Sequence, residues 1–310
     1  MKVLFVSSGN KKDGISPIIL NQGEAIRREG VDIDYFTVAG KGWWGYISHW
    51  LPLINVLRHN QYDLIHAHYS LCGFLATLAA PTGIPIIVSL MGTFRKNTGK
   101  YYLVRFLAKY RWQEVIVKSE RMRGQIGLFT AHLIPNGVEI EKFNLPLSRV
   151  QLREELGLAK DRKIVIFVSD PERIEKNFPL CRASIDAINR SDIDLIPVFN
   201  KPHEEVVKYM LAANVLMLTS LSEGSPNVIK EAMAANCPIV CTNVGDVAYL
   251  LSGLKGAFIS TKFDENELST LVERALLINN TEGLKRIKYL QIDSISIAKK
   301  IVGLYKNNIQ

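Results

Sequence analysis

The feature that most constrains this chain is a repeated alternation of short apolar runs with helix-like runs. The first three apolar runs are "KVLFVSS", "DIDYFTV" and "YDLIHAH", and stretches of helical periodicity lie between most of the runs. Short continuous runs rich in Val and Ile are typical of parallel strands buried on both faces. Because parallel strands need crossover connections, the alternation predicts an α/β fold with doubly wound parallel sheets.

The alternation stops once and then restarts, which predicts two domains. The break lies at residues 144–148, inside "PNGVEIEKFNLPLSR", where a turn and two prolines interrupt the pattern. We expect residues 1–144 to form one Rossmann-like domain and residues 145–292 a second one. The two halves should face a central cleft, and ligands of such sheets bind beyond the carboxyl ends of the strands.

The bulk composition favours a cytoplasmic protein with an ample core. Of the 310 residues, 47% are hydrophobic, which suits one large or two medium domains. The chain lacks an apolar run of about 18 residues, and "MKVLFVSSGN" turns polar too soon for a signal peptide. The four cysteines are scattered, which favours buried, reduced thiols over a metal site with four convergent ligands.

Positive charge is spread unevenly along the chain. The formal net charge is +8, and residues 95–123 hold nine basic and two acidic side chains. Such a patch attracts anions, among them lipid head groups, diphosphates and nucleic acid, although a solvated helix face explains it equally well. No nucleic-acid reader motif is recognisable, so we expect no nucleic-acid partner.

The stretch "TSLSEGSPNVIKEAMAANCPIV" runs a short apolar strand directly into a helix start. Ser225 is predicted as the N-cap and Pro226 as the first helical residue, while Gly224 lets a ligand approach the backbone. The "GISP" that begins at Gly14 repeats the device, and there an ordinary capped helix is the favoured interpretation. A helix start offers free N–H groups and a positive dipole end, which together bind anions.

Two glutamates flank this helix start. Glu231 lies about five residues into the helix, ~7.5 Å from its start, which is close to the reach from a diphosphate to the ribose of a nucleotide. A carboxylate there can accept hydrogen bonds from two vicinal hydroxyls. Glu223 lies on the other side of the helix start, where a sugar would be bound. With the strand, the glycine and the cap, this spacing indicates a nucleotide diphosphate sugar and is unsuited to glycoside hydrolysis.

A diphosphate leaving group needs cations nearby. "DPERIEKNFPL" follows the first strand of the second half and offers Arg173 and Lys176. Charge-assisted bonds to phosphate oxygens strengthen as the leaving bond breaks, while surface charges on a loop are the alternative interpretation. The pocket for the base is expected near "VFNKPH", residues 198–203, with Asn200 as its donor-binding candidate.

At these residues the sequence resembles a retaining glycosyltransferase of the GT-B fold. It is most similar to the family four (group 1) type of the bacterial surface-polysaccharide and lipid-linked glycan branch. The matching landmarks cover nearly the whole chain in order: "YDLIHAH", "GIPIIVSLMGTF", "IPNGVEIEKF", "RIEKN" and "SEGSPNVIKEAMAANCPIVCTNVGDV". The resemblance implies transfer of a hexose-type sugar from a UDP- or GDP-linked donor to a glycan or lipid-linked acceptor. It implies retention of configuration and neither a metal ion nor a cofactor.

The resemblance also implies residue roles. Glu223 would contact the donor sugar and Glu231 the ribose, while Arg173 and Lys176 would bind the diphosphate, although this basic pair is closer in sequence than is usual in the family. The first half would bind the acceptor, and a last helix at about residues 293–310 would cross back to it. Backbone groups of the turn would assist at Gly224, Ser225, Pro226 and Asn227.

The chain departs from the family pattern in its first half. Many members have His-Gly where this chain has Met91 and Gly92, and Gly14 stands where a glycine cluster is common. His68 is the nearest candidate to replace the missing histidine, with a core or acceptor-site role as the other interpretation. These three residues, His68, Met91 and Gly92, are the acceptor-side candidates. Two alternatives stay open: a sugar-nucleotide epimerase of GT-B fold, and a non-catalytic nucleotide-sugar-binding module, which the missing histidine supports.

The stretch "GKGWWGYISHWLPLINVLRHN" is aromatic, apolar and mildly basic. It resembles an interfacial amphipathic segment. Together with the basic stretch, it predicts peripheral association with an anionic inner membrane face through residues 43–59 and 95–123. A core helix with a solvated face is the alternative interpretation.

Overall fold

The computed structural model describes residues 1–9, 14–40, 42–91 and 96–309, which form two α/β units. One unit comprises Met1–Gly137 with Ser294–Gln310, and the other comprises Val138–Asp293. The division therefore falls after Gly137 instead of after residue 144. The reason is that Val138 and Phe143 already pack into the core of the second unit.

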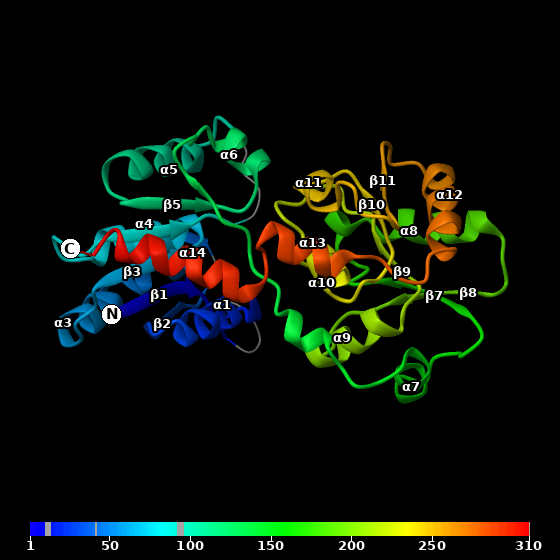
Figure 1. The fold of residues 1–310 in the computed structure, drawn as a ribbon. Helices are drawn as coiled ribbons and strands as arrows, with labels where there is room; N and C mark the ends of the chain where they lie inside the picture. Colours follow the sequence, from blue (N-terminus) through cyan, green and yellow to red (C-terminus); the bar gives the residue numbers. More distant parts are fainter. Residues whose placement is uncertain (10–13, 41, 92–95, 310) are drawn as a thin grey trace. The chain divides into compact units, whose positions relative to one another are not determined.

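The first unit is built on a six-stranded parallel sheet in the order β2-β1-β3-β4-β5-β6 (Figure 1). Its strands are β1 (Lys2–Ser8), β2 (Asp32–Val38), β3 (Leu64–His68), β4 (Ile86–Ser89), β5 (Glu114–Val117) and β6 (His132–Leu133). In β1, Val3 and Phe5 lie in one core, and Leu4 and Val6 lie in another. Since alternate side chains point to opposite faces, the sheet is buried on both sides, as the apolar runs predict.

Helices cover both faces of this sheet. On one face α1 (Pro17–Arg28) and α14 (Ser294–Lys306) lie side by side (Figure 1). The other face is covered by α2 (Gly42–Ser48), α3 (Trp50–His59), α4 (Ser70–Ala79), α5 (Gly99–Tyr110) and α6 (Glu120–Ile126). Tyr305 anchors α14, because its hydroxyl lies 2.5 Å from Nδ1 of the buried His66 in β3. This contact explains why the last helix belongs to the first unit.

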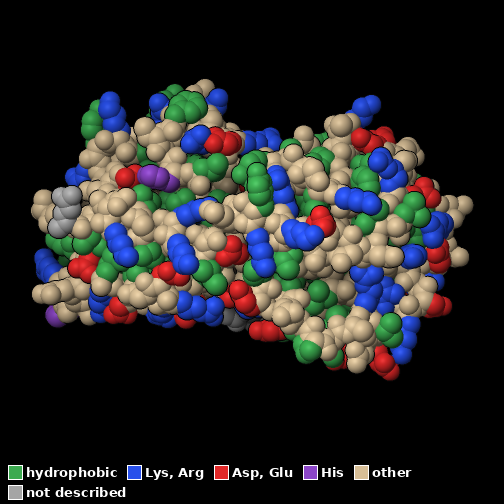
Figure 2. Space-filling view, viewed as in Figure 1, with side chains coloured by type: hydrophobic (Ala, Val, Ile, Leu, Met, Phe, Trp, Pro, Cys, Tyr) green, Lys and Arg blue, Asp and Glu red, His purple; other side chains and the backbone are tan. Residues whose placement is uncertain are grey.

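The predicted amphipathic segment at residues 43–59 lies in the two helices α2 and α3, with a break at His49. Over α5 and α6, hydrophobic side chains stand at the surface beside Lys and Arg (Figure 2). Within the described ranges, no helix combines the length and apolarity needed to cross a bilayer.

The second unit is built on a five-stranded parallel sheet in the order β11-β10-β9-β7-β8. Its strands are β7 (Lys163–Phe167), β8 (Ile193–Pro197), β9 (Val215–Leu218), β10 (Ile239–Thr242) and β11 (Ala257–Ser260). The chain passes from β7 to β8 on one side, and β9 then pairs with the other side of β7. The carboxyl ends of β7 and β9 therefore form a topological switch point, where sheets of this kind bind ligands.

Helices also cover both faces of the second sheet. One face carries α8 (Phe178–Ile188) and α12 (Glu265–Leu276). The other carries α9 (His203–Ala212), α10 (Asn227–Ala234), α11 (Val247–Leu251) and α13 (Gly283–Leu290). The remaining elements are the 3-10 turns η1 (Ile140–Phe143) and η2 (Ile174–Lys176) and the helix α7 (Arg149–Glu155). The predicted linker thus lies inside the second unit, where Ser148 and Gln151 form the capping box of α7.

All four cysteines are buried and free. They lie at Cys72, Cys181, Cys237 and Cys241, and the two that are close in sequence belong to the core of the second unit. The interpretation of these residues as buried thiols is confirmed.

Candidate functional site

The candidate site lies on the loops that follow β7, β9 and β10 in the second unit. Hydrogen bonds from strand-end threonines join these loops. Thr219 Oγ1 donates to the carbonyl oxygen of Asn177 at 2.9 Å, and Thr242 Oγ1 donates to that of Ser220 at 2.7 Å. Asn177 adopts a left-handed conformation with φ 53°, which ends the turn η2 and starts α8. The three loops therefore form one connected framework for the side chains above them.

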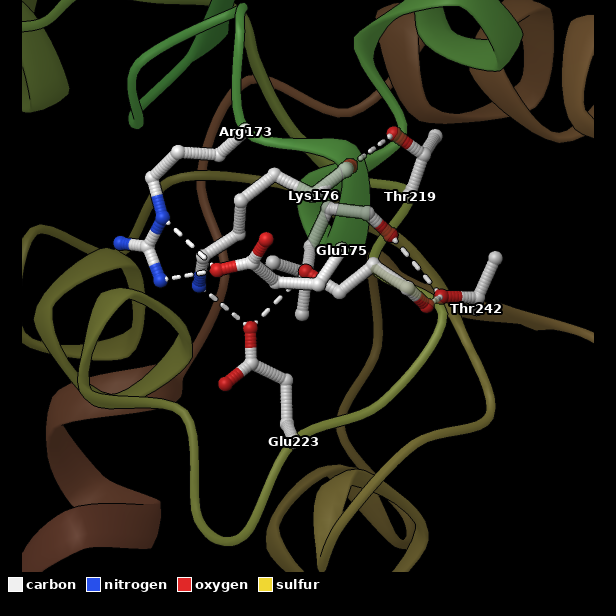
Figure 3. Close-up of polar contacts among 8 residues, drawn as sticks. Arg173, Glu175, Lys176, Thr219, Glu223 and Thr242 are labelled. Carbon is white, nitrogen blue, oxygen red and sulfur yellow. Dashed lines mark hydrogen bonds and ion pairs between the residues drawn. The ribbon is translucent and has the colours of Figure 1, made fainter. Parts of the chain in front are cut away.

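Lys176 and Glu223 form an ion pair at the switch point. Lys176 Nζ lies 2.5 Å from Glu223 Oε1, and both side chains are 17% exposed. The hydroxyl of Ser220 donates to the same carboxylate oxygen at 2.8 Å. Lys176 follows β7 and Glu223 follows β9, so the two side chains approach from neighbouring strands (Figure 3). The structure thus brings together two of the three predicted catalytic residues.

The side chain of Arg173, the third predicted catalytic residue, pairs with Glu175. Its Nε donates to Glu175 Oε1 at 2.8 Å, its Nη2 pairs with the same oxygen, and its side chain is 53% exposed. The hydrogen bond from Arg173 lowers the pKa of Glu175. The two residues belong to one tight turn, in which Glu175, two residues along the chain, takes the guanidinium, as Figure 3 shows. To bind a phosphate, Arg173 would have to leave Glu175.

Helix α10 begins one residue later than predicted. The helix begins at Asn227, with Pro226 at the N-cap in an extended conformation. Ser225 is therefore not the N-cap. Its hydroxyl accepts a hydrogen bond from Lys230 Nζ at 3.3 Å and also hydrogen-bonds the carboxyl of Asp246.

In the first unit, the turn before α1 lies at the predicted residues. Ser16 is the N-cap of α1 and Pro17 its first residue, although the serine side chain makes no capping bond. Gly14 has φ 83°, a conformation that favours glycine.

Glu231 lies in α10 and contacts the first residue of α9. His203 Nε2 lies 3.2 Å from Glu231 Oε1, and the side chains are 32% and 21% exposed. The hydrogen bond to Glu231 raises the pKa of His203. Asn200, in the loop before α9, is exposed and left-handed at φ 54°. The loop predicted to bind the base is thereby joined, through His203, to the glutamate predicted to bind the ribose.

Two of the acceptor-side candidates of the first unit, His68 and Met91, are buried or partly buried. His68 is fully buried, stacks on His66 at 4.3 Å between ring centroids, and has Nε2 2.8 Å from Gln22 Oε1. Burial lowers its pKa well below the usual value. His68 is therefore a core histidine, and its acceptor-side assignment is corrected. Met91 is partly buried against the same core, and Gly92 lies outside the described residues.

Two further features of the sites escaped the sequence analysis. Lys230 is 1% exposed in α10. Its position, three residues before the buried Met233, could have indicated an inward-facing side chain. Tyr69, which follows β3, has φ 75°, a strained conformation for a residue with a side chain. The sequence carries no signal for that strain.

Two family profiles match the chain. Residues 13–142 match the profile described as Glycosyltransferase Family 4, and residues 192–289 match Glycosyl transferases group 1. TuaC of Bacillus subtilis, named for teichuronic acid biosynthesis, is 26% identical over 64% of this chain and 58% of its own length. UDP-Gal:α-D-GlcNAc-diphosphoundecaprenol α-1,3-galactosyltransferase of Escherichia coli is 23% identical over 82% of this chain and 74% of its own.

Solved structures share the fold of the whole chain. Sucrose-phosphate synthase of Thermosynechococcus elongatus superposes with a TM-score of 0.80 at 18% identity, covering 99% of this chain and 98% of that one. Anabaena HepE in complex with UDP-glucose superposes with a TM-score of 0.75 at 17% identity, covering 99% and 100%. At these identities the likeness shows the fold alone.

Proposed function

Because the chain belongs to the group 1 glycosyltransferases and has the GT-B fold, we propose that it transfers a hexose-type sugar from a UDP- or GDP-linked donor to a glycan or lipid-linked acceptor. The transfer retains the anomeric configuration and serves surface-polysaccharide synthesis. The observation that carries the proposal is the Lys176–Glu223 pair at the switch point, with Glu231 in the helix that follows. The names of the two bacterial relatives, one for teichuronic acid biosynthesis and one for galactosyl transfer from UDP-galactose, support the substrate class.

In this proposal, Lys176 binds the diphosphate end of the donor and Glu223 binds its sugar end. The ammonium of Lys176 has three donors; Glu223 takes one, so phosphate oxygens can take the others. Glu223 keeps a second carboxylate oxygen for hydroxyls of the sugar. As the bond between the sugar and the phosphate breaks, negative charge grows on the leaving diphosphate, where Lys176 and the start of α10 stabilise it. The acceptor hydroxyl attacks from the same face and gives its proton to the leaving phosphate oxygen.

We also propose that this chemistry needs no metal ion and no cofactor, with the cations of the site taking the place of a metal at the diphosphate. Arg173 is the second cation in this proposal, and it exchanges Glu175 for a phosphate oxygen when the donor binds. The protein would work in the cytoplasm, on the inner face of the membrane.

The test of the function is a transfer assay. The purified chain is incubated with radiolabelled UDP-glucose, UDP-galactose, UDP-N-acetylglucosamine or GDP-mannose, with and without a lipid extract from a polysaccharide-producing bacterium. Label that enters the lipid fraction only when extract is present supports the proposal. Isomerised donor without acceptor would identify an epimerase, and bound but unconsumed donor would identify a non-catalytic module.

Replacing Glu231 is expected to weaken donor binding. In Glu231→Ala, the Kd of the nucleoside diphosphate should rise about ten- to hundredfold, since a carboxylate that accepts from two ribose hydroxyls contributes about 1.5–3 kcal/mol. Calorimetric titration measures the change. The matched control is Glu204→Ala, which removes an exposed carboxylate from α9 and should leave the Kd unchanged. An equal loss for the 2′,3′-dideoxy nucleotide would show that Glu231 does not bind the ribose.

The first unit offers a surface for the proposed membrane contact. Along α5, Tyr102, Phe106 and Tyr110 recur every fourth residue and are 59%, 57% and 60% exposed. Val104 and Leu107 point into the core from the other side of the helix. Aromatic rings at a helix surface beside basic side chains are typical of membrane interfaces. The basic stretch at residues 95–123 therefore also presents an aromatic helix face.

Vesicle sedimentation tests this contact. The chain is expected to bind vesicles with anionic lipids at low salt, and the double variant Phe106→Ser with Tyr110→Ser should bind several-fold more weakly. The matched control replaces Tyr249 and Tyr289, which are 60% and 78% exposed in the second unit, and should bind as the unchanged chain does. Equal binding by both double variants would contradict the proposed membrane surface.

A further inference from the structure

Helix α10 contains a buried lysine, Lys230, whose side chain reaches the turn before the helix. Lys230 is 1% exposed, and its neighbours Ile229 and Met233 belong to the core of the second unit. A buried ammonium is costly unless it is hydrogen-bonded. Its Nζ donates to Ser225 Oγ at 3.3 Å, so the lysine side chain runs back along its helix to the turn.

Ser225 links this lysine to an acid on another loop. A lysine ammonium can only donate hydrogen bonds, so Ser225 Oγ accepts from Lys230 and its hydroxyl donates to Asp246. Asp246 is partly buried after β10, and among the described residues its Oδ1 has no hydrogen-bond partner. A chain of side-chain hydrogen bonds therefore joins the helix, the turn and the loop after β10.

Backbone packing holds the same loop against the turn. Gly245 has φ 59°, and a Cβ atom placed on it would lie 2.7 Å from the carbonyl oxygen of Gly224. Only a residue without a side chain allows this approach. The turn is therefore fixed from one side by the backbone of Gly245 and from the other by Lys230.

Lys230 brings a positive charge to this cluster, and Asp246 brings a negative one. Burial lowers the pKa of Lys230 to about 8, so the ammonium stays largely protonated at neutral pH. Burial raises the pKa of the Asp246 carboxyl, while nearby Lys230 opposes that shift. The ammonium acts on the turn through Ser225 and adds to the positive dipole end of α10.

We propose that Lys230 is a positioning residue of the donor site, which fixes the turn at residues 223–226 and lends it positive charge for recognising a diphosphate. The inference rests on the proposed function and goes beyond it: the buried lysine makes the site select a nucleoside diphosphate over the monophosphate. Asp246 acts in the opposite direction, since its negative charge weakens the attraction for the ligand.

The test measures the Kd of both ligands by calorimetry. The diphosphate is whichever of UDP, GDP and ADP binds the unchanged chain, and the monophosphate is its counterpart. In Lys230→Met, which keeps an unbranched side chain without charge, the Kd of the diphosphate should rise about tenfold. The Kd of the monophosphate should change by less than about threefold. Thermal unfolding of each variant checks that it folds.

The variant Asp246→Asn is expected to change diphosphate binding in the direction opposite to Lys230→Met. The amide oxygen still accepts from Ser225, while the negative charge is gone, so the diphosphate should bind about two- to fivefold more tightly. A purely structural role predicts that both variants weaken both ligands by the same factor. If Lys230→Met does not fold, Asp246→Asn alone decides: tighter diphosphate binding supports the proposal, and unchanged or weaker binding overturns it.

The outcomes separate this inference from the function on which it rests. If the unchanged chain binds a diphosphate and Lys230→Met binds it equally well, the inference is wrong and the proposed function stands. If both ligands weaken equally in Lys230→Met, the inference is also wrong. If the unchanged chain binds none of the three diphosphates, both proposals fail.

Discussion

Replacing Lys176 with alanine is expected to lower kcat for sugar transfer by about 10²–10³-fold. Lys176 is the cation at the switch point, and its ammonium has hydrogen-bond donors to spare beyond the one that Glu223 accepts. Its contribution grows as charge develops on the leaving diphosphate, so the loss should fall on kcat more than on KM. Initial rates measured over a range of donor concentrations separate the two parameters.

Two arginine variants serve as comparisons for Lys176→Ala. Arg173→Ala should lower kcat by about tenfold, less than Lys176→Ala, because Arg173 must first exchange Glu175 for a phosphate. Arg190→Ala is the matched control: Arg190 also pairs with an acid two residues away, Asp192, and it lies before β8, at the amino end of that strand, whereas the candidate site follows the carboxyl ends of the strands. Its kcat should be unchanged. If Arg173→Ala behaves like Arg190→Ala, Arg173 does not belong to the site.

Replacing Gly283 with alanine is expected to destabilise the second unit by about 3 kcal/mol or more. Gly283 starts α13 where this helix touches the backbone of α10. A Cβ atom there would lie 2.6 Å from Met233 Cα and would also meet the Met233 carbonyl oxygen. Backbone atoms cannot rotate away as a side chain can, so α10 would have to move, and Glu231 with it. The free energy of unfolding in urea measures the cost.

Gly303→Ala is the control for this prediction. Gly303 lies inside α14, and nothing stands within 4 Å of a Cβ atom placed there. Alanine is the better helix former, so this variant should be up to about 1 kcal/mol more stable. A Gly283→Ala protein within 1 kcal/mol of the unchanged chain would show that α13 and α10 can separate at little cost.

The sequence predicts the sheets well because their signal is local. Strand β2 matches "DIDYFTV" from end to end. A strand buried on both faces must be apolar throughout, whatever packs against it. The alternation also shows that Lys176 and Glu223 each follow a strand, and the structure pairs these two strands, β7 and β9, in the sheet.

The errors concern polar side chains whose partners come from elsewhere in the fold. Ser225 has the residue type of an N-cap, yet a lysine one turn along α10 and an acid after β10 take its hydroxyl. His68 ends a strand, where a histidine could be exposed, but Gln22 of α1 covers it. Such contacts depend on which elements pack together, and residue spacing does not record that.

The most direct test of the account is calorimetric titration of the chain with UDP, GDP and ADP, with and without EDTA. The account predicts saturable binding of one of the three, with the same Kd in EDTA, through Lys176, the turn before α10 and Glu231. Absence of binding by all three would contradict the proposed diphosphate site. Binding that EDTA abolishes would contradict its metal independence.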